Sequence, residues 1–260
     1  MKQTVVLAGG IVAYVAFLAS FSYLMAFMAG VGVPKGVDSG QVGSLGQSIL
    51  INALLVGLFG LQHAVMARDW FKARWTRIVP EPLERSVFVV AASLILGLLF
   101  WQWQAIPALV WDIETPWLRG IIWCLFACGI GTVLYTSLLI DHFDLFGLRQ
   151  VWLYFRGRPY TPVPYTVRSL YKVVRHPMMD GILLTLWCVP TMSLGHLQLA
   201  LFMTAYIVVG VHMEERSLLR KLGEDYRQYC EHTPMLIPVP ARWRRRKTSG
   251  PQPLATEGSA

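Results

Sequence analysis

Residues 175–215 read RHPMMDGILLTLWCVPTMSLGHLQLALFMTAYIVVGVHMEE. Two apolar arms flank a short turn at 193–196, a pattern that predicts a hydrophobic helical hairpin with few polar groups at its tip. Pro177 suits the first position of a helix, where its missing N–H costs nothing. The first turn of a helix also offers unpaired N–H groups and a positive dipole end, which suit a carboxylate or phosphate.

Charged residues gather at the open end of this hairpin. Arg175 and His176 precede the first arm, and Glu214 and Glu215 follow the second at the same depth. The sequence therefore predicts a ligand site there with charges of both signs.

The composition is that of a polytopic membrane protein. Hydrophobic residues make up 55% of the 260 residues and charged residues 15%, and the mean hydropathy is +0.47. A membrane-spanning helix needs about 20 apolar residues, and the runs that approach or exceed this length are 4–29, 47–67, 86–104, 118–140 and the two arms of 178–213. We predict an all-α integral membrane protein with five to six transmembrane helices, depending on whether both arms of the hairpin span.

The distribution of Lys and Arg predicts the orientation. Segment 68–85 carries five of them, 141–175 carries six and the region after Glu215 carries nine, whereas 104–118 has none. The positive-inside rule then places both termini and the open end of the hairpin in the cytoplasm of a multi-pass protein of the cell (inner) membrane. Because the net charge of +8 is divided among separate loops, it does not indicate nucleic-acid binding.

Few side chains in the predicted spans are polar. Asn52, Gln62 and His63 are functional candidates, because polar groups are costly at membrane depth, although a His near the headgroups is more often a satisfied interfacial residue. The four cysteines form no CxxC motif and have no histidine at metal-ligand spacing, so we predict no metal site.

The loop at 142–160, HFDLFGLRQVWLYFRGRPY, mixes aromatic residues with His, Asp and Arg. One interpretation is an amphipathic helix in the membrane interface, with its arginines toward lipid phosphate. The other is a substrate lid, in which aromatic rings enclose a small apolar molecule and His142, Asp144 or Arg149 performs proton chemistry. The residues alone favour neither.

The order of motifs from Arg175 onward resembles that of the isoprenylcysteine carboxyl methyltransferase and phospholipid methyltransferase superfamily. The residues that carry this resemblance are Arg175, His176, Pro177, Gly181, Glu214, Glu215, Tyr226, Tyr229, Pro234 and Pro238. The resemblance implies a membrane-embedded, S-adenosylmethionine-dependent methyltransferase with its cofactor at the cytosolic end of the hairpin. The segment 142–161, with the four spans before it, resembles the bacterial methanethiol S-methyltransferases, relatives of the nitric-oxide-reductase accessory proteins. That second resemblance implies methylation of methanethiol to dimethyl sulfide, with S-adenosylhomocysteine as the other product.

We predict three parts: N-terminal transmembrane helices at 1–140, a catalytic region at 141–247 and, from its Gly, Pro and Ser content, a disordered tail at 248–260. One residue departs from the superfamily pattern Arg-His-Pro-x-Tyr-x-Gly, because Met179 stands at the tyrosine position, followed by Asp180. Any contact that the tyrosine makes to cofactor or substrate is lost or replaced here.

For this reaction the thiol must lose its proton, because the thiolate is the nucleophile. We expect His142 to be the base, with Tyr154 or Asp144 acting through water as alternatives, and Arg149 to lower the thiol pKa. The predicted walls of the pocket for the small thiol are Trp152, Tyr154, Phe155 and Tyr160.

For the cofactor, Arg175 and the helix start at Pro177 are predicted to take the methionine carboxylate, and Glu214 or Glu215 the ribose hydroxyls or the amino group. His176, Gly181 and His212 complete the predicted site, with His212 sharing a helix face with Glu215. Arg175 and a glutamate could instead form only an ion pair that closes the hairpin. Two other functions stay open from the residues: methylation of a prenylcysteine carboxylate or lipid headgroup, and a non-enzymatic role as a membrane accessory protein.

Overall fold

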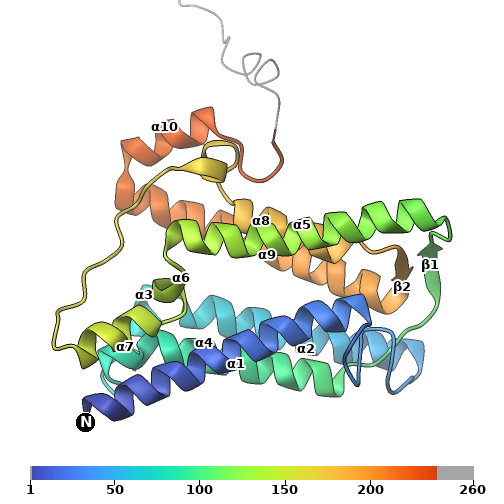
Figure 1. The fold of residues 1–260 in the computed structure, drawn as a ribbon, viewed down its shortest axis with the longest axis horizontal. Helices are drawn as coiled ribbons and strands as arrows, with labels where there is room; N and C mark the ends of the chain where they lie inside the picture. Colours follow the sequence, from blue (N-terminus) through green and yellow to red (C-terminus); the bar gives the residue numbers. More distant parts are fainter. Residues whose placement is uncertain (1, 239–260) are drawn as a thin grey trace, which may run out of the picture.

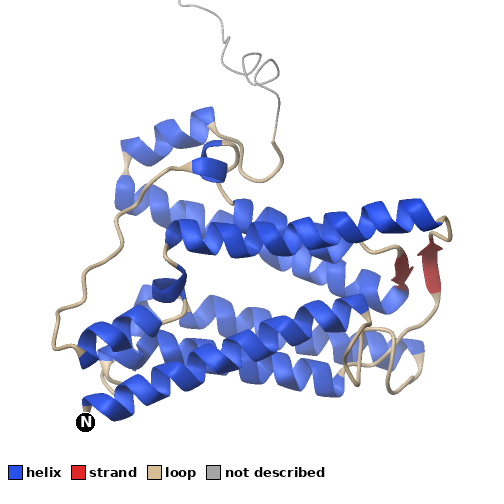
Figure 2. Cartoon of the chain, in the orientation of Figure 1, coloured by secondary structure: helices blue, strands red, loops and turns tan. Residues whose placement is uncertain are grey.

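The computed structural model describes residues 2–238 as a bundle of helices with one small sheet (Figures 1 and 2). The end of the predicted catalytic region, 239–247, and the predicted tail at 248–260 lie outside the described residues. The helices are α1 (Gln3–Ala29), α2 (Leu45–Met66), α3 (Asp69–Trp75), η1 (Glu81–Leu83), α4 (Glu84–Gln102), α5 (Pro116–Ile140), α6 (His142–Leu145), α7 (Leu148–Phe155), η2 (Ser169–Lys172), α8 (Pro177–Trp187), α9 (Leu194–Leu222) and α10 (Glu224–His232). The strands are β1 (Leu109–Asp112) and β2 (Thr191–Ser193).

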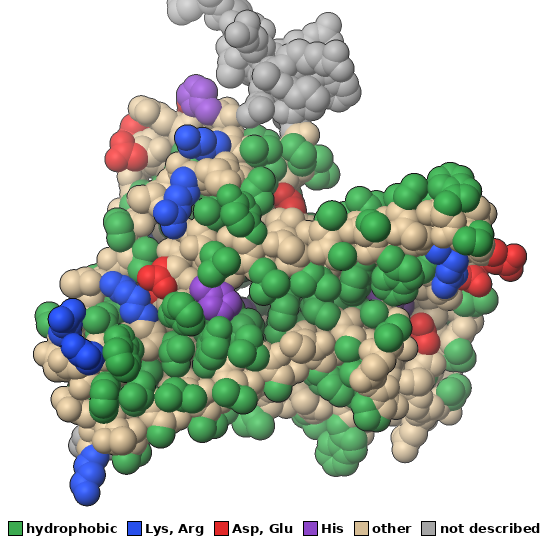
Figure 3. Space-filling view, in the orientation of Figure 1, with side chains coloured by type: hydrophobic (Ala, Val, Ile, Leu, Met, Phe, Trp, Pro, Cys, Tyr) green, Lys and Arg blue, Asp and Glu red, His purple; other side chains and the backbone are tan. Residues whose placement is uncertain are grey.

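Five helices are long and apolar enough to cross a membrane, namely α1, α2, α4 with its preceding turn, α5 and α9. They correspond to the four predicted N-terminal spans and the second arm of the hairpin. Figure 3 shows hydrophobic side chains along the bundle, with charged side chains at its two ends and on α10. Large apolar side chains such as Val12, Leu54, Leu94 and Leu138 are exposed on the helices, as contact with lipid requires. The predicted all-α integral membrane architecture is confirmed.

The first arm of the hairpin is shorter than its apolar run suggested. Helix α8 has 11 residues, or about 16 Å, whereas the hydrocarbon core of a bilayer is about 30 Å thick. After Trp187 the chain continues without helix to β2 at the opposite end of the bundle (Figure 1). Two of its backbone carbonyls there are paired, because Ile113 N–H donates to Pro190 O at 3.0 Å and the Trp111 indole N–H to Val189 O at 3.2 Å. Such pairing allows non-helical backbone at membrane depth.

The tip of the hairpin is a polar junction, so the expectation of few polar groups there was wrong. Strand β2 pairs antiparallel with β1, which places Ser193 at the start of α9. The Ser193 hydroxyl accepts from His196 N–H at 3.0 Å and donates to the Asp38 carboxylate. The buried His196 ring lies with Nε2 3.0 Å from Leu186 O. The sequence of the turn at 193–196 could not predict these contacts, because the partners Asp38 and β1 come from distant loops.

Glycines bring helices into close contact at two places. A Cβ at Gly181 of α8 would lie 2.8 Å from the Gly129 carbonyl oxygen of α5, and one at Gly10 of α1 would lie 2.3 Å from a Val151 methyl of α7. Small residues allow this approach, which drives helix association in lipid through van der Waals packing. The two contacts fix α8 against α5 and α7 against α1.

Asn52, a functional candidate from its depth in the membrane, serves the packing. It is fully buried, donates to Gln104 O at 2.9 Å and to Gln198 Oε1 at 3.2 Å, and accepts from Gln104 N–H at 2.9 Å. It therefore joins α2 to the chain after α4 and to α9. His63 packs among aromatic rings, with Phe88 at 4.7 Å and Phe59 at 5.5 Å between ring centroids.

Candidate active site

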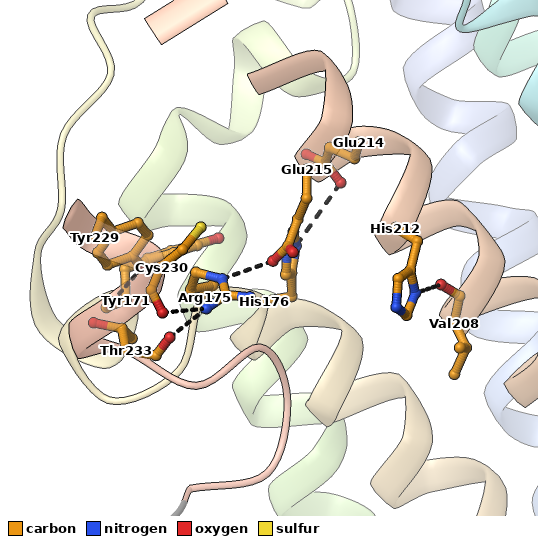
Figure 4. A network of polar contacts seen from close by, with 10 residues as sticks. All are labelled: Tyr171, Arg175, His176, Val208, His212, Glu214, Glu215, Tyr229, Cys230 and Thr233. Atoms are coloured by element: carbon orange, nitrogen blue, oxygen red, sulfur yellow. Dashed lines mark hydrogen bonds and ion pairs between the residues drawn. The ribbon is translucent and has the colours of Figure 1, made fainter. Parts of the chain in front are cut away.

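The open end of the hairpin is held by Arg175 (Figure 4). Its Nε donates to Glu215 Oε1 at 2.6 Å, and its Nη1 donates to the carbonyl of Cys230 at 3.0 Å and to that of Thr233. The side chains of Arg175 and Glu215 are only 10% and 14% exposed. These contacts tie the segment before α8 to α9 and to the end of α10. The guanidinium keeps both N–H groups of Nη2 without a partner in the described part of the chain.

His176 joins the two glutamates. Its ring is buried, with Nε2 3.2 Å from Glu215 Oε1 and Nδ1 3.8 Å from Glu214 Oε2. The Glu214 side chain is 54% exposed, so its carboxylate is the acidic group of this cluster that is open to a ligand.

A group of tyrosines covers the same end. Tyr226 of α10 is fully buried, and its hydroxyl has no hydrogen-bond partner among the residues that the structure describes. The rings of Tyr165 and Tyr229 lie 6.1 Å and 5.8 Å from that of Tyr226. Burial raises the pKa of Tyr165 and of Tyr171 to about 12, and it raises the pKa of Tyr226 and Tyr229 as well. The phenols therefore stay protonated at neutral pH and can donate hydrogen bonds.

Helix α8 begins at Pro177, as predicted, but its first turn has little free capacity for an anion. The N–H groups of Met179 and Asp180 both donate to the His176 carbonyl, at 3.0 Å and 3.2 Å. Among the described residues, the backbone N–H of Met178 is the only N–H group of this first turn that has no hydrogen-bond partner.

Two of the predicted cofactor residues lie apart from the charged cluster. Gly181 faces the Gly129 carbonyl of α5, where it has a clear packing role. His212 lies on α9 with its Nδ1 2.7 Å from the Val208 carbonyl, and Figure 4 shows it away from Arg175 and Glu215.

A second polar cluster lies in α6 and α7, within the loop that was predicted as an interfacial helix or a lid. Arg149 Nη1 donates to Asp144 Oδ1 at 2.9 Å, and Arg149 Nε lies 3.7 Å from Asp141 Oδ2. The Tyr160 hydroxyl donates to Asp144 Oδ2 at 3.3 Å. The hydrogen bond to Asp144 raises the pKa of Arg149, and burial raises that of Tyr160. The Arg149 charge is thus matched by two carboxylates.

His142 lies beside this cluster and faces α1 and α5. Its Nε2 is 2.8 Å from the Tyr14 hydroxyl, and its Nδ1 is 2.8 Å from the Ser137 hydroxyl, which itself donates to Leu134 O at 2.7 Å. Burial lowers the pKa of His142, although the nearby Asp141 opposes this. The ring is therefore neutral at neutral pH and able to accept a proton.

A cavity of about 760 Å³ opens between α3, the start of α4, and the α6–α7 segment. It is in the size range of ligand pockets, and the residues of mixed charge and aromatic character that line it include Lys72, Arg85, Asp144, Tyr154, Arg158 and Tyr160. Trp152 and Phe155 do not line it. They stack on each other at 5.9 Å between ring centroids, and Trp152 is 48% exposed.

The end of α5 separates the two clusters. Tyr135 and Leu139 bond to the segment before α8, through the Ser169 hydroxyl at 2.9 Å and the Arg168 guanidinium. Ser137, which points the opposite way on a helix of 3.6 residues per turn, bonds to His142. Within residues 2–238, no hydrogen bond or ion pair joins the Arg175 cluster directly to the His142–Asp144 segment.

Comparison with known proteins identifies the family. The methanethiol S-methyltransferase of Mycobacterium tuberculosis is 45% identical over 242 residues, which cover 93% of this chain and 99% of that protein. The corresponding enzyme of Crocosphaera subtropica is 43% identical over 238 residues, covering 92% and 93%. The chain belongs to the methanethiol S-methyltransferase family. Nurim of Rattus norvegicus is a more distant relative, 29% identical over 213 residues. No protein-family model and no solved structure matches the chain.

In this member of the methanethiol S-methyltransferase family, the sequence did not single out Tyr14 and Ser137 as candidate site residues. Both lie inside apolar spans and hold the His142 ring. The signal was present for Tyr14, because a hydroxyl at membrane depth is a functional candidate by default, but its partner lies 128 positions away. Tyr226 was noted only as part of a motif, and its unpartnered hydroxyl is visible only in the fold.

Proposed function

We propose that this protein transfers a methyl group from S-adenosylmethionine to methanethiol and releases dimethyl sulfide and S-adenosylhomocysteine. The observation that carries the proposal is the 45% identity to a methanethiol S-methyltransferase over nearly the full length of both chains. The membrane-embedded bundle suits the reaction, because a small apolar thiol and a volatile thioether partition into lipid.

The residues at the open end of the hairpin fit such a cofactor. Arg175 has the two N–H groups of Nη2 left to donate to a carboxylate, and Glu214 offers an exposed carboxylate for an ammonium or a hydroxyl. The buried Tyr226 hydroxyl has no partner in the described chain, and a polar ligand atom would satisfy it. We assign Arg175, His176, Glu214 and Tyr226 to cofactor binding, with Glu215 holding Arg175 in place.

When bound, the cofactor supplies an electrophilic methyl group on a sulfonium. The protein must then align a thiolate with that methyl group and accept the proton of the thiol. An alkanethiol is mostly protonated at neutral pH, given that a free cysteine thiol has a pKa of about 8.5. The neutral His142 ring is the proton acceptor that we assign, and Arg149 is left a lesser role because Asp141 and Asp144 already balance its charge.

We propose further that the protein lies in the cell (inner) membrane with both termini and the Arg175 cluster facing the cytosol. The basic segments at 68–85 and 141–175 lie at the end of the bundle where α2 and α5 finish, in support of this orientation. The cofactor is made in the cytosol, so the cluster would be open to it.

Headspace gas chromatography tests the proposal on detergent-purified protein given S-adenosylmethionine and methanethiol. We expect dimethyl sulfide well above the level of a Glu214→Ala, Glu215→Ala double variant. Calorimetry with S-adenosylhomocysteine should show binding to the wild type and not to this variant. Binding without dimethyl sulfide would overturn the thiol acceptor in favour of a lipid or prenylcysteine acceptor, and no binding at all would favour an accessory protein.

A further inference from the structure

We propose that Tyr14 of α1 takes the proton of the thiol and passes its own proton to His142 Nε2. The phenol, and not the imidazole, is then the group that touches the substrate sulfur. This inference rests on the proposed thiol methyl transfer, and it assigns to the first transmembrane helix a catalytic residue for that reaction.

The hydrogen bonds around His142 fix the direction of this relay. The single hydrogen of the Ser137 hydroxyl is donated to Leu134 O at 2.7 Å, so Ser137 Oγ must accept from His142 Nδ1, which lies 2.8 Å away. Nδ1 then carries the ring proton, and Nε2 is left with a lone pair. The Tyr14 hydroxyl, 2.8 Å from Nε2, donates to it. Its oxygen keeps a free lone pair with which it can receive a proton.

The surroundings of Tyr14 suit a small apolar thiol. The rings of Phe17, Phe143 and Phe146 lie 6.2 Å, 6.1 Å and 6.4 Å from that of Tyr14. Tyr14 and His142 are both half-buried, so a ligand can reach them. The neighbouring positions of α1, including Val12 and Val15, are exposed apolar side chains, so the surroundings of Tyr14 on this helix are apolar as well.

The proposed reaction conserves protons and electrons. The thiol proton goes to Tyr14 Oη while the phenol proton goes to His142 Nε2, which leaves methanethiolate and an imidazolium. A sulfur lone pair of methanethiolate forms the new S–CH3 bond as the S–CH3 bond of the donor breaks and its electron pair stays on the donor sulfur. The imidazolium then loses its proton to water, either directly or through Tyr14, which passes its own proton on to water, so that one proton is released per turnover.

Charges around His142 do not hinder its role. Helix α1 brings Tyr14, α5 brings the uncharged Ser137, and the turn before α6 brings Asp141, whose charge favours the imidazolium. Because burial lowers the pKa of His142 below its ordinary value near 6.5, the base form prevails at pH 7 and above. The wild-type rate should therefore change little with pH between 7 and 9.

The test is a pH profile of kcat/KM for methanethiol in Tyr14→Phe, with Tyr23→Phe as the matched control. Tyr23 lies on the same helix, and its hydroxyl donates to Lys35 O at 3.1 Å, far from His142. We expect Tyr14→Phe to lose on the order of 10²–10⁴-fold at pH 7. Its rate should then rise about tenfold per pH unit, because only thiolate formed in solution can react. Tyr23→Phe should follow the wild type.

Two results would overturn the relay. If Tyr14→Phe lost the same factor at every pH, Tyr14 would only hold α6 against α1. If it lost nothing while wild type made dimethyl sulfide, another group would accept the proton. Binding of S-adenosylhomocysteine, measured by calorimetry on each variant, should stay unchanged. A wild-type protein without dimethyl sulfide formation would instead defeat the proposed function itself.

Discussion

The open end of the hairpin and the α6–α7 segment meet the end of α5 from opposite sides, and they are stabilised by different physics. At the hairpin, a nearly buried guanidinium and a nearly buried carboxylate form a short ion pair, Arg175 with Glu215. At α6, neutral groups hold the histidine, through Tyr14 and Ser137. The first arrangement fixes permanent charges, whereas the second keeps a titratable ring neutral and ready to accept a proton.

This difference matches the two tasks of a thiol methyltransferase. A zwitterionic donor needs fixed charges and unpaired polar groups, which Arg175, Glu214 and Tyr226 offer. A small thiol needs an apolar surface, which Phe143 and Phe146 next to His142 provide, and one proton acceptor, which is His142 in the mechanism that we propose. Variants in the two regions should therefore differ in what they change: cofactor binding and stability at the hairpin, and turnover at His142.

The largest effect is expected from Glu215→Ala. Removing one partner of a buried ion pair leaves the other charge uncompensated, at a cost of about 3–5 kcal/mol, and Arg175 would lose its place between α9 and α10. We expect a large fall in the thermal unfolding midpoint in detergent and loss of S-adenosylhomocysteine binding. Glu224→Ala is the matched control, because Glu224 and Arg227 form an exposed pair worth about 0–1 kcal/mol. Equal midpoints for the two variants would contradict a structural role for the buried pair.

His142→Ala comes next and acts on turnover alone. Loss of a general base lowers the rate by about 10²–10⁴-fold, whereas the Arg175 cluster has no direct bond to this region within residues 2–238. Steady-state dimethyl sulfide formation should fall, while calorimetry with S-adenosylhomocysteine gives the wild-type affinity. A parallel loss of binding would show that the two regions are coupled through α5.

Sequence reasoning succeeded where a pattern was local. The apolar runs predicted the four N-terminal spans, and Pro177 predicted the start of α8. It failed where a partner was distant. The first hairpin arm reads as one apolar run through Pro190, yet the helix ends at Trp187 because the next residues pair with the chain near β1.

The same limit applies to the candidate site. The order of charged residues at 175–176 and 214–215 predicted a cluster with both signs, and the fold brings these residues together. The spacing of motif residues could not separate a packing role from a binding role for Gly181, because the contact that decides it comes from Gly129 on another helix. Nor could it reveal that Tyr14 meets His142, since helix α1 carries no motif.

Gly181→Ala tests that packing role and is expected to have a moderate effect. The added methyl group would lie 2.8 Å from the Gly129 carbonyl oxygen, so α5 and α8 must separate, at a cost of about 1–3 kcal/mol. The midpoint of thermal unfolding should fall, and Gly131→Ala, where nothing lies within 4 Å of the added carbon, should leave it unchanged. Weaker S-adenosylhomocysteine binding with an unchanged midpoint would instead make Gly181 a direct cofactor contact.

Trp152→Ala should have the smallest effect of these variants. It tests whether the exposed side of α7 forms part of the wall of the substrate pocket. Trp152 is 48% exposed and stacks on Phe155, and the Arg156 guanidinium lies 5.7 Å from its ring. An aromatic residue in that setting is typical of the membrane interface, so truncation should change unfolding by no more than about 0.5 kcal/mol and leave KM for methanethiol unchanged.

Tyr154→Ala is the matched variant from the cavity side of the same helix. Removing this ring enlarges the cavity, so KM for methanethiol should rise and thiols larger than methanethiol should become better competitors. Both variants would be assayed against ethanethiol and methanethiol in one mixture. If Trp152→Ala, and not Tyr154→Ala, shifted the product ratio, then the outer face of α7 would be the wall. The thiol would then reach the site from the lipid side of that helix and not through the cavity.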